Sequence, residues 1–182
     1  MRFRIFGLVA IVAFVVACFL GSASAQAQFA QQGPKLVGTY ILGAYAAQGA
    51  SVALSADGNT AVVSGIDNSS GVGAVWVFMR VGGMWSQQAQ LAGSGGIGSL
   101  GGPVALSADG NTVIVGDAAD DSGVGAAWVF TRAGDVWNQQ AKLVATDALG
   151  PYMLQGYSVA LSSDGNTAIG TVKLTESRLG GS

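Results

Sequence analysis

Three carboxylates lie close together in one short stretch of this 182-residue chain. Asp117, Asp120 and Asp121 fall within five consecutive residues, and Gly123 closes the stretch. Carboxylate oxygens are the ligands that calcium takes in proteins, and a glycine permits the sharp turn that brings them around an ion. These three aspartates are therefore the candidate ligands of a weak calcium site, and a solvated acidic loop is the favoured alternative.

Other kinds of chemical site find no support in the composition. The chain has no histidine, the commonest general base and metal ligand, so a catalytic triad built on imidazole is excluded. The sequence also contains no paired glutamates, nucleophile elbow or phosphate-binding loop. We therefore expect a protein that is not an enzyme, with no catalytic residues and no cofactor besides the weakly bound calcium.

The acidic stretch belongs to a repeat of about fifty residues. The nonapeptide Val-Ala-Leu-Ser-Ala-Asp-Gly-Asn-Thr occurs, with one change in its last copy, at residues 52–60, 104–112 and 159–167. Asp-Gly between apolar stretches predicts a hairpin turn, because glycine takes the positive φ that such turns need. Asp57, Asp109 and Asp164 are therefore interpreted as turn residues and not as ligands.

Each repeat carries four short strand signals in a row. In the first copy the expected strands are 51–55, 60–64, 74–78 and 85–91. Valine and aromatic residues dominate them, and glycine-bearing turns separate them. Four strands in about fifty residues is the size of one β-propeller blade. The prediction is an all-β chain of four-stranded antiparallel blades, a partial β-propeller of about two and a half blades, with no helix after the N-terminus.

Large aromatic residues recur at strand spacing in the two complete repeats. Trp76 and Phe78 of the first copy correspond to Trp128 and Phe130 of the second. Side chains of this size bury much apolar surface when they pack between sheets. We interpret them as core residues and not as a platform on which a ligand stacks.

The N-terminus has the pattern of a secretory signal peptide over residues 1–27. Arg2 and Arg4 precede an uncharged stretch at residues 5–20, and small residues follow it. The stretch is shorter than the roughly 20 residues that a membrane span needs, so a transmembrane anchor is the weaker alternative. We expect the chain to be secreted, periplasmic or located at the cell surface.

Cleavage of that signal changes the composition of the mature chain. Cleavage removes Cys18, the only cysteine, so the mature chain can form no disulfide. Residues 15–18 loosely resemble a lipobox, so the alternative is that Cys18 is kept and lipidated. Cleavage also removes two of the eight basic residues, which leaves six against ten acidic ones. Without a basic patch, we expect no nucleic acid and no anionic membrane as partner.

A partial repeat follows the signal. The residues Lys-Leu-Val at 35–37 precede Val52 by the same 17 residues that separate Lys-Leu-Val at 142–144 from Val159. We therefore expect residues 28–48 to contain the outer strand of a preceding repeat. A closed ring is often completed by such a first strand.

The repeated sequence segments resemble the FG-GAP repeat of integrin-α-type β-propellers, in the form found in secreted bacterial proteins. The first copy of these segments occupies Gly49 to Ser55, Ala61 to Gly65 and Gly73 to Phe78. The second copy occupies residues 101–107, 113–116 and 125–130, and a third copy begins at residues 156–169. The resemblance implies a propeller fold. It also implies an extracellular role in adhesion or binding.

Two departures from that family matter. Many FG-GAP repeats carry a calcium loop of the form Asp-x-Asp-x-Asp-Gly, whereas the corresponding turn here has one carboxylate, so we expect that site to be lost. The chain also supplies fewer blades than the seven of an integrin-like ring. From Gly170 onward the sequence matches no segment of the repeat.

These observations predict a division of the chain into five parts. They are a signal peptide at 1–27, an N-terminal outer strand and linker at 28–48, propeller blades at 49–100 and 101–155, and an incomplete blade with a divergent tail at 156–182. We expect a piece of a longer propeller. Because the incomplete blade leaves apolar strands uncovered, we also expect self-association.

Three functions from different classes fit this organisation. The first is a secreted, non-catalytic module that binds an extracellular protein or glycan through propeller loops. The second is an accessory domain of a larger extracellular hydrolase, and the third is an inactive truncated gene product. We favour the first, although a fold alone does not determine function.

Overall fold

The structure, a computed structural model, describes residues 30–39, 46–67, 73–93, 100–146 and 153–173. The expected signal peptide at 1–27, with Cys18, lies outside the described residues, as does the tail from residue 174. The chain divides into two units, Met1–Gln31 and Gln32–Ser182. The second unit holds every strand described below.

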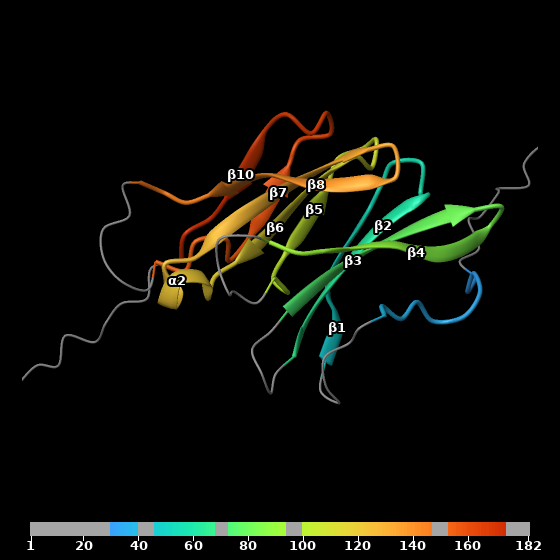
Figure 1. Cartoon of the computed structure of the whole chain (residues 1–182), viewed down its shortest axis with the longest axis horizontal. Coiled ribbons are helices and arrows are strands. Elements are labelled where there is room, and N and C mark those ends of the chain that lie inside the picture. Colours follow the sequence, from blue (N-terminus) through green and yellow to red (C-terminus); the bar gives the residue numbers. More distant parts are fainter. Residues whose placement is uncertain (1–29, 40–45, 68–72, 94–99, 147–152, 174–182) are drawn as a thin grey trace, which may run out of the picture. The chain divides into compact units, whose positions relative to one another are not determined.

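The described residues form three antiparallel sheets that follow one another along the chain (Figure 1). Sheet 1 contains β1 (Ala46–Leu54), β2 (Thr60–Asp67), β3 (Gly73–Val81) and β4 (Met84–Leu91). Sheet 2 contains β5 (Val104–Leu106), β6 (Thr112–Asp117), β7 (Ala126–Ala133) and β8 (Val136–Leu143). Sheet 3 contains β9 (Val159–Leu161) and β10 (Ala168–Gly170). The prediction of a β-rich chain with four-stranded antiparallel sheets is confirmed.

The turn between β1 and β2 explains why the nonapeptide recurs. Asp57 Oδ1 accepts hydrogen bonds from Ser55 Oγ and from the backbone amide of Asn59, at 2.5 and 2.9 Å. Ser55 Oγ in turn accepts the amide of Thr60 at 2.9 Å, and Gly58 has a φ of +68°. The same bonds recur at Ser107, Asp109, Asn111 and Thr112, and at Ser162, Asp164, Asn166 and Thr167. The interpretation of these aspartates as turn residues is confirmed.

Sheets 1 and 2 share one hydrophobic core. Trp128 and Phe130 from β7 pack in one cluster with Val62, Val75 and Val77 from sheet 1, and all five side chains are buried. On its other face, sheet 1 buries Trp76 and Phe78 in a second cluster, to which Leu36 and Trp85 add. The aromatic residues are therefore core residues, as predicted.

Backbone hydrogen bonds also connect the turns of successive sheets. The amide of Ala56 donates to the carbonyl of Ala108 at 2.9 Å, and the amide of Ala108 donates to the carbonyl of Ser163 at 2.9 Å. We call this row of bonds the turn ladder. The first strands of the sheets lie beside it, because β5 contacts both β1 and β9.

Two details of the elements differ from the expectations. Residues 30–39 contain no strand; instead, the amide of Gly38 bonds to Gln48 Oε1 at 3.1 Å, and Trp76 Nε1 donates to the carbonyl of Thr39 at 3.0 Å. An outer strand needs a neighbouring strand to satisfy its backbone. The structure describes no such strand on the far side of this segment.

The second difference is a single helical turn. A one-turn segment, α2 (Asp120–Gly123), follows β6, although Asp121 and Ser122 within it have positive φ. Such a short segment does not alter the β architecture. Within the described ranges, no helix is long enough and apolar enough to cross a membrane.

Candidate functional site

The acidic stretch connects the buried strands β6 and β7. β6 ends at Asp117, and α2 carries the chain back toward Ala126 at the start of β7. The turn closes through the amide of Gly125, which donates to the carbonyl of Asp120 at 2.9 Å. Asp121 adopts a φ of 46°, which an aspartate tolerates better than most residues. The backbone therefore leaves Asp117 and Asp120 buried and Asp121 exposed, instead of wrapping all three carboxylates around one point.

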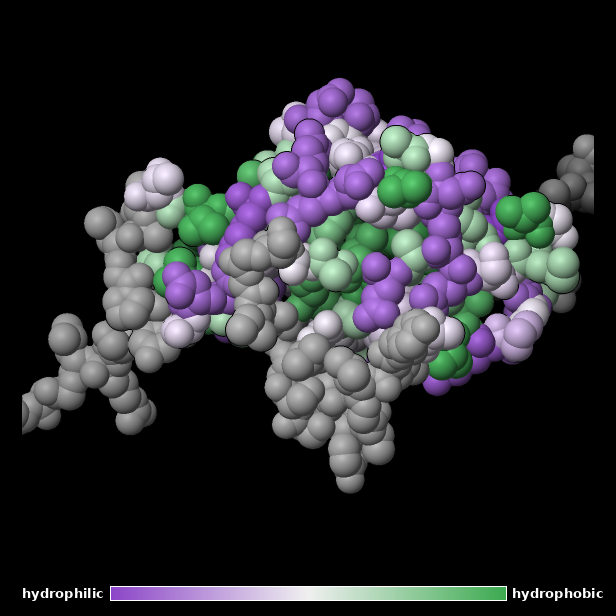
Figure 2. Space-filling view, viewed as in Figure 1, coloured by the Kyte–Doolittle hydropathy of each residue, from purple (hydrophilic) through white to green (hydrophobic). Residues whose placement is uncertain are grey.

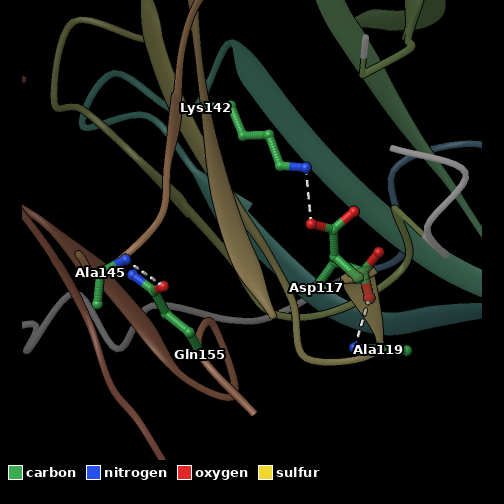
Figure 3. Close-up of polar contacts among 6 residues, drawn as sticks. Asp117, Ala119, Lys142, Ala145 and Gln155 are labelled. Carbon is green, nitrogen blue, oxygen red and sulfur yellow. Dashed lines mark hydrogen bonds and ion pairs between the residues drawn. The ribbon is translucent and has the colours of Figure 1, made fainter. Parts of the chain in front are cut away.

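Asp117 is buried at the end of β6, with 3% of its surface exposed. Its Oδ1 accepts the amide of Ala119 at 2.9 Å (Figure 3). Its Oδ2 finds no hydrogen-bond partner among the described residues. Burial raises the pKa of the Asp117 carboxyl, and the nearby Asp120 carboxylate raises this pKa further, against the opposing hydrogen bond from Ala119.

Asp120 is equally buried but has a countercharge. Its Oδ2 lies 2.7 Å from Lys142 Nζ, and Asp120 is 2% exposed. Lys142 comes from β8, and its ammonium also lies 5.0 Å from the centre of the Trp128 ring. A lysine therefore supplies the positive charge for which the sequence had suggested calcium.

The three predicted calcium ligands do not form a cluster. Asp121 is exposed, whereas the other two carboxylates are buried. Across the ranges that the structure describes, no three acidic, histidine or cysteine side chains gather as metal ligands. The calcium site thus gains no support from the geometry. The alternative of a solvated loop is wrong for Asp117 and Asp120.

Lys142 is the functional neighbour that sequence reasoning missed. It follows Asp120 by more than twenty residues, so no local spacing rule joins them. The comparison of the two repeats could nevertheless have indicated the pair. The first repeat, which lacks the acidic stretch, has Gln90 at the position of Lys142. The repeat that has the acidic stretch is therefore also the repeat that has the lysine.

The acidic stretch holds the entry of the third repeat. The amides of Leu154 and Gln155 donate to the carbonyls of Gly123 and Val124, each at 3.0 Å. Gln155 Oε1 accepts the amide of Ala145 at 2.7 Å, a contact drawn in Figure 3. The arrangement of Asp117, α2 and Lys142 therefore positions the backbone carbonyls of Gly123 and Val124, to which the start of the third repeat is hydrogen-bonded.

A second surface lies at the hairpin tips between β3 and β4 and between β7 and β8. Its exposed apolar residues are Val81, Met84 and Val136, and we call these three residues the tip surface. Beside each tip an arginine lies over a tryptophan ring, namely Arg80 over Trp85 at 5.7 Å and Arg132 over Trp137 at 5.4 Å. Figure 2 shows apolar residues alternating with hydrophilic ones on one face of the molecule.

A scan against protein-family models finds no matching family, and a search of curated proteins finds no match.

Proposed function

We propose that this chain is a secreted, non-catalytic binding module whose sheets are blades of a β-propeller of the FG-GAP type. Supporting this proposal, the first strands β1, β5 and β9 lie next to one another, and the turn ladder connects them. Radial stacking of repeated antiparallel sheets through their first strands is the propeller arrangement.

The tip surface is the proposed binding site, and its partner is an extracellular protein. The observation that carries this proposal is the exposure of Met84 and Val136, at 76% and 61%, on neighbouring hairpins. Exposed apolar groups rimmed by polar residues mark protein interaction sites. Arginine and tryptophan, which border both tips, are the residues that dominate binding energy at such sites.

The two tips are held in a fixed relation by polar contacts between the sheets. Gln88 of β4 donates to Asp135 Oδ1 at 3.2 Å and accepts from Trp137 Nε1 at 3.0 Å. Arg132 Nη1 also donates to Gln88 Oε1 at 3.2 Å. A surface that is already ordered loses little entropy when a partner binds.

The test is a binding measurement on the purified chain against immobilised extracellular proteins and a glycan array. The variant Met84→Ser, Val136→Ser should lose at least about tenfold in affinity for its protein partner, equivalent to about 1.4 kcal/mol. Val144→Ser is the matched control, since Val144 is also an exposed valine but lies away from both tips.

Equal binding by the tip variant and the wild type would contradict the proposed site. Binding confined to glycans would contradict the proposed class of partner.

A further inference from the structure

The outer face of sheet 1 is a copy of a face that is buried elsewhere in the molecule. Val52 of β1 corresponds to Val104 of β5, one repeat later. Val52 is 67% exposed, whereas Val104 is 8% exposed. Leu54, which corresponds to the partly buried Leu106, is also exposed. The residue types are the same, so the difference lies in what covers them.

Sheet 1 provides the cover for Val104 and Leu106. Both pack in the shared core with Val62 of β2, and Ala53 of β1 adds to the same cluster. This contact between sheets has two halves. One half is formed by Val104 and Leu106 on the first strand of sheet 2. The other half is formed by Ala53 and Val62 on sheet 1.

The second half of this contact recurs, uncovered, on sheet 3. Ile169 of β10 corresponds to Val62 and to Ile114, and Ala160 of β9 corresponds to Ala53. Ile169 and Ala160 are paired across the strands β10 and β9. Val62 and Ile114 are completely buried, whereas Ile169 is 62% exposed.

We propose that two copies of this chain associate head to tail, with the outer face of sheet 3 in one copy covering the outer face of sheet 1 in the next. Ile169 and Ala160 of the first copy then contact Val52 and Leu54 of the second. The interface repeats the internal contact between sheets 1 and 2, and this continuity is why a second copy is the occupant.

The turn ladder fits the same association. Each turn in the ladder donates its amide to the carbonyl of the turn in the next sheet. Within the described residues, the carbonyl of Ala56 at one end of the ladder and the amide of Ser163 at the other end take part in no ladder bond. Both residues are exposed. In the head-to-tail pair, Ser163 of one copy donates to Ala56 of the next, which adds one more bond of the existing kind.

Steric fit at the turns supports the same register. A Cβ atom on Gly110 would lie 2.7 Å from Thr60 Oγ1, so the second turn packs closely on the first. Thr60 is buried by this packing, whereas Thr167, its copy in sheet 3, is exposed. Gly58 of a second copy has the backbone conformation that Gly110 uses to cover Thr60.

The two faces are different, so the association is heterologous. Each copy retains one free face of each kind after pairing, and growth therefore continues until a ring closes or a filament forms. This geometry gives the test a clear design, because one substitution can block each face separately.

The experiment measures the mass of the purified chain by sedimentation as its concentration rises. Leu54→Lys blocks the sheet 1 face, and Ile169→Lys blocks the sheet 3 face; both side chains are exposed, so the fold tolerates the change. The wild type should form a closed ring of two or more copies, or a longer species, and each variant alone should stay monomeric. An equimolar mixture of the two variants should form a dimer and nothing larger, because it contains one usable interface.

Val144→Lys is the matched control, an exposed valine that belongs neither to the two proposed faces nor to the tip surface, and it should associate as the wild type does. A monomeric wild type, a mixture of blocked variants that stays monomeric, or a control that no longer associates would overturn the proposal. Far-UV circular dichroism checks the strand content of each variant, and Leu54→Thr with Ile169→Thr replaces any lysine variant that loses it. Failure here leaves the proposed function of the tip surface untouched, since the two surfaces share no residue.

Discussion

At the scale of single residues, three aspartates close together in sequence behave in three different ways. Asp120 is buried and forms an ion pair with Lys142, Asp117 is buried and accepts the amide of Ala119, and Asp121 is exposed. Among the described residues, Asp117 Oδ2 and Asp120 Oδ1 have no hydrogen-bond partner. The aspartates of the turns behave differently again. Hydrogen bonds from Ser107 and from the amide of Asn111 hold the pKa of Asp109 below its usual value. The environment of each carboxylate, and not its sequence spacing, decides its role.

Lys142→Met should destabilise the fold by about 3 kcal/mol, because it leaves the buried Asp120 carboxylate without its countercharge. Lys142→Arg, which keeps the charge, should lose much less. Urea unfolding followed by tryptophan fluorescence measures both variants. An equal loss in the two would show that the packing of the lysine stem, and not its charge, is what matters.

Asp117→Asn should change the pH dependence of stability. Burial raises the pKa of Asp117 in the folded state, so its protonated form stabilises the fold at low pH. That contribution is lost as the pH rises from about 4, the unfolded value, through the raised folded pKa. The stability of the variant relative to wild type should therefore increase across this window, measured by urea unfolding at a series of pH values.

Asp109→Asn is the matched control, and its effect should have the opposite sign. The folded pKa of Asp109 is lowered, so its stabilisation is present above about pH 4 and is lost as the pH falls through the folded pKa. The variant should be less stable than wild type at pH 7 and should approach wild type in acid. Parallel pH profiles for the two variants would contradict the assignment of the Asp117 pKa to burial.

At the scale of elements, glycines at strand ends allow neighbouring repeats to approach closely. A Cβ atom on Gly116, in β6, would collide with the backbone carbonyl of Gly156 at the entry of the third repeat. The carbonyl belongs to the backbone and cannot rotate away. The spacing of glycines in the repeat is therefore a requirement of packing between sheets.

Gly116→Ala should destabilise the protein by about 2–3 kcal/mol through this collision. Gly170→Ala is the control, because its Cβ would meet only Ala127 Cβ, at an ordinary contact distance of 4.0 Å, and neither glycine has a positive φ. The control should stay within about 0.5 kcal/mol of wild type. Thermal unfolding of both variants provides the comparison, and similar losses would contradict the steric argument.

At the scale of the whole molecule, the shared core makes sheets 1 and 2 one cooperative unit. Val62 and Val77 of sheet 1 are buried in the same cluster as Val115 and Trp128 of sheet 2. Neither sheet can open without exposing the core of the other. Sheet 3 differs, because its strands are three residues long and Ile169 on its outer face is exposed.

Native-state hydrogen exchange should therefore show two levels of protection. Amides of β2, β3, β6 and β7 should exchange together at the free energy of global unfolding, and those of β9 and β10 should exchange at a lower free energy. Measurement at a dilute concentration keeps head-to-tail association from protecting sheet 3. Separate exchange of sheets 1 and 2 would contradict a single cooperative core.

The sequence by itself determined the local features of this protein. The antiparallel strands and the Asp-Gly turns were predicted, because each depends on residues within a few positions of one another. The repeat was predicted from the recurrence of the nonapeptide. The burial of Trp76 and Trp128 also followed, since large aromatics in valine-rich strands have no better place than a core.

Only the tertiary structure decided the contacts between distant residues. The pairing of Asp120 with Lys142, and the packing of Leu36 against the Trp76 cluster, join positions far apart in the chain. The same is true of the exposed and buried copies Val52 and Val104, which the sequence cannot tell apart. Identical residues differ there because burial depends on the neighbouring sheet, and a repeat specifies its own fold without specifying which neighbours it has.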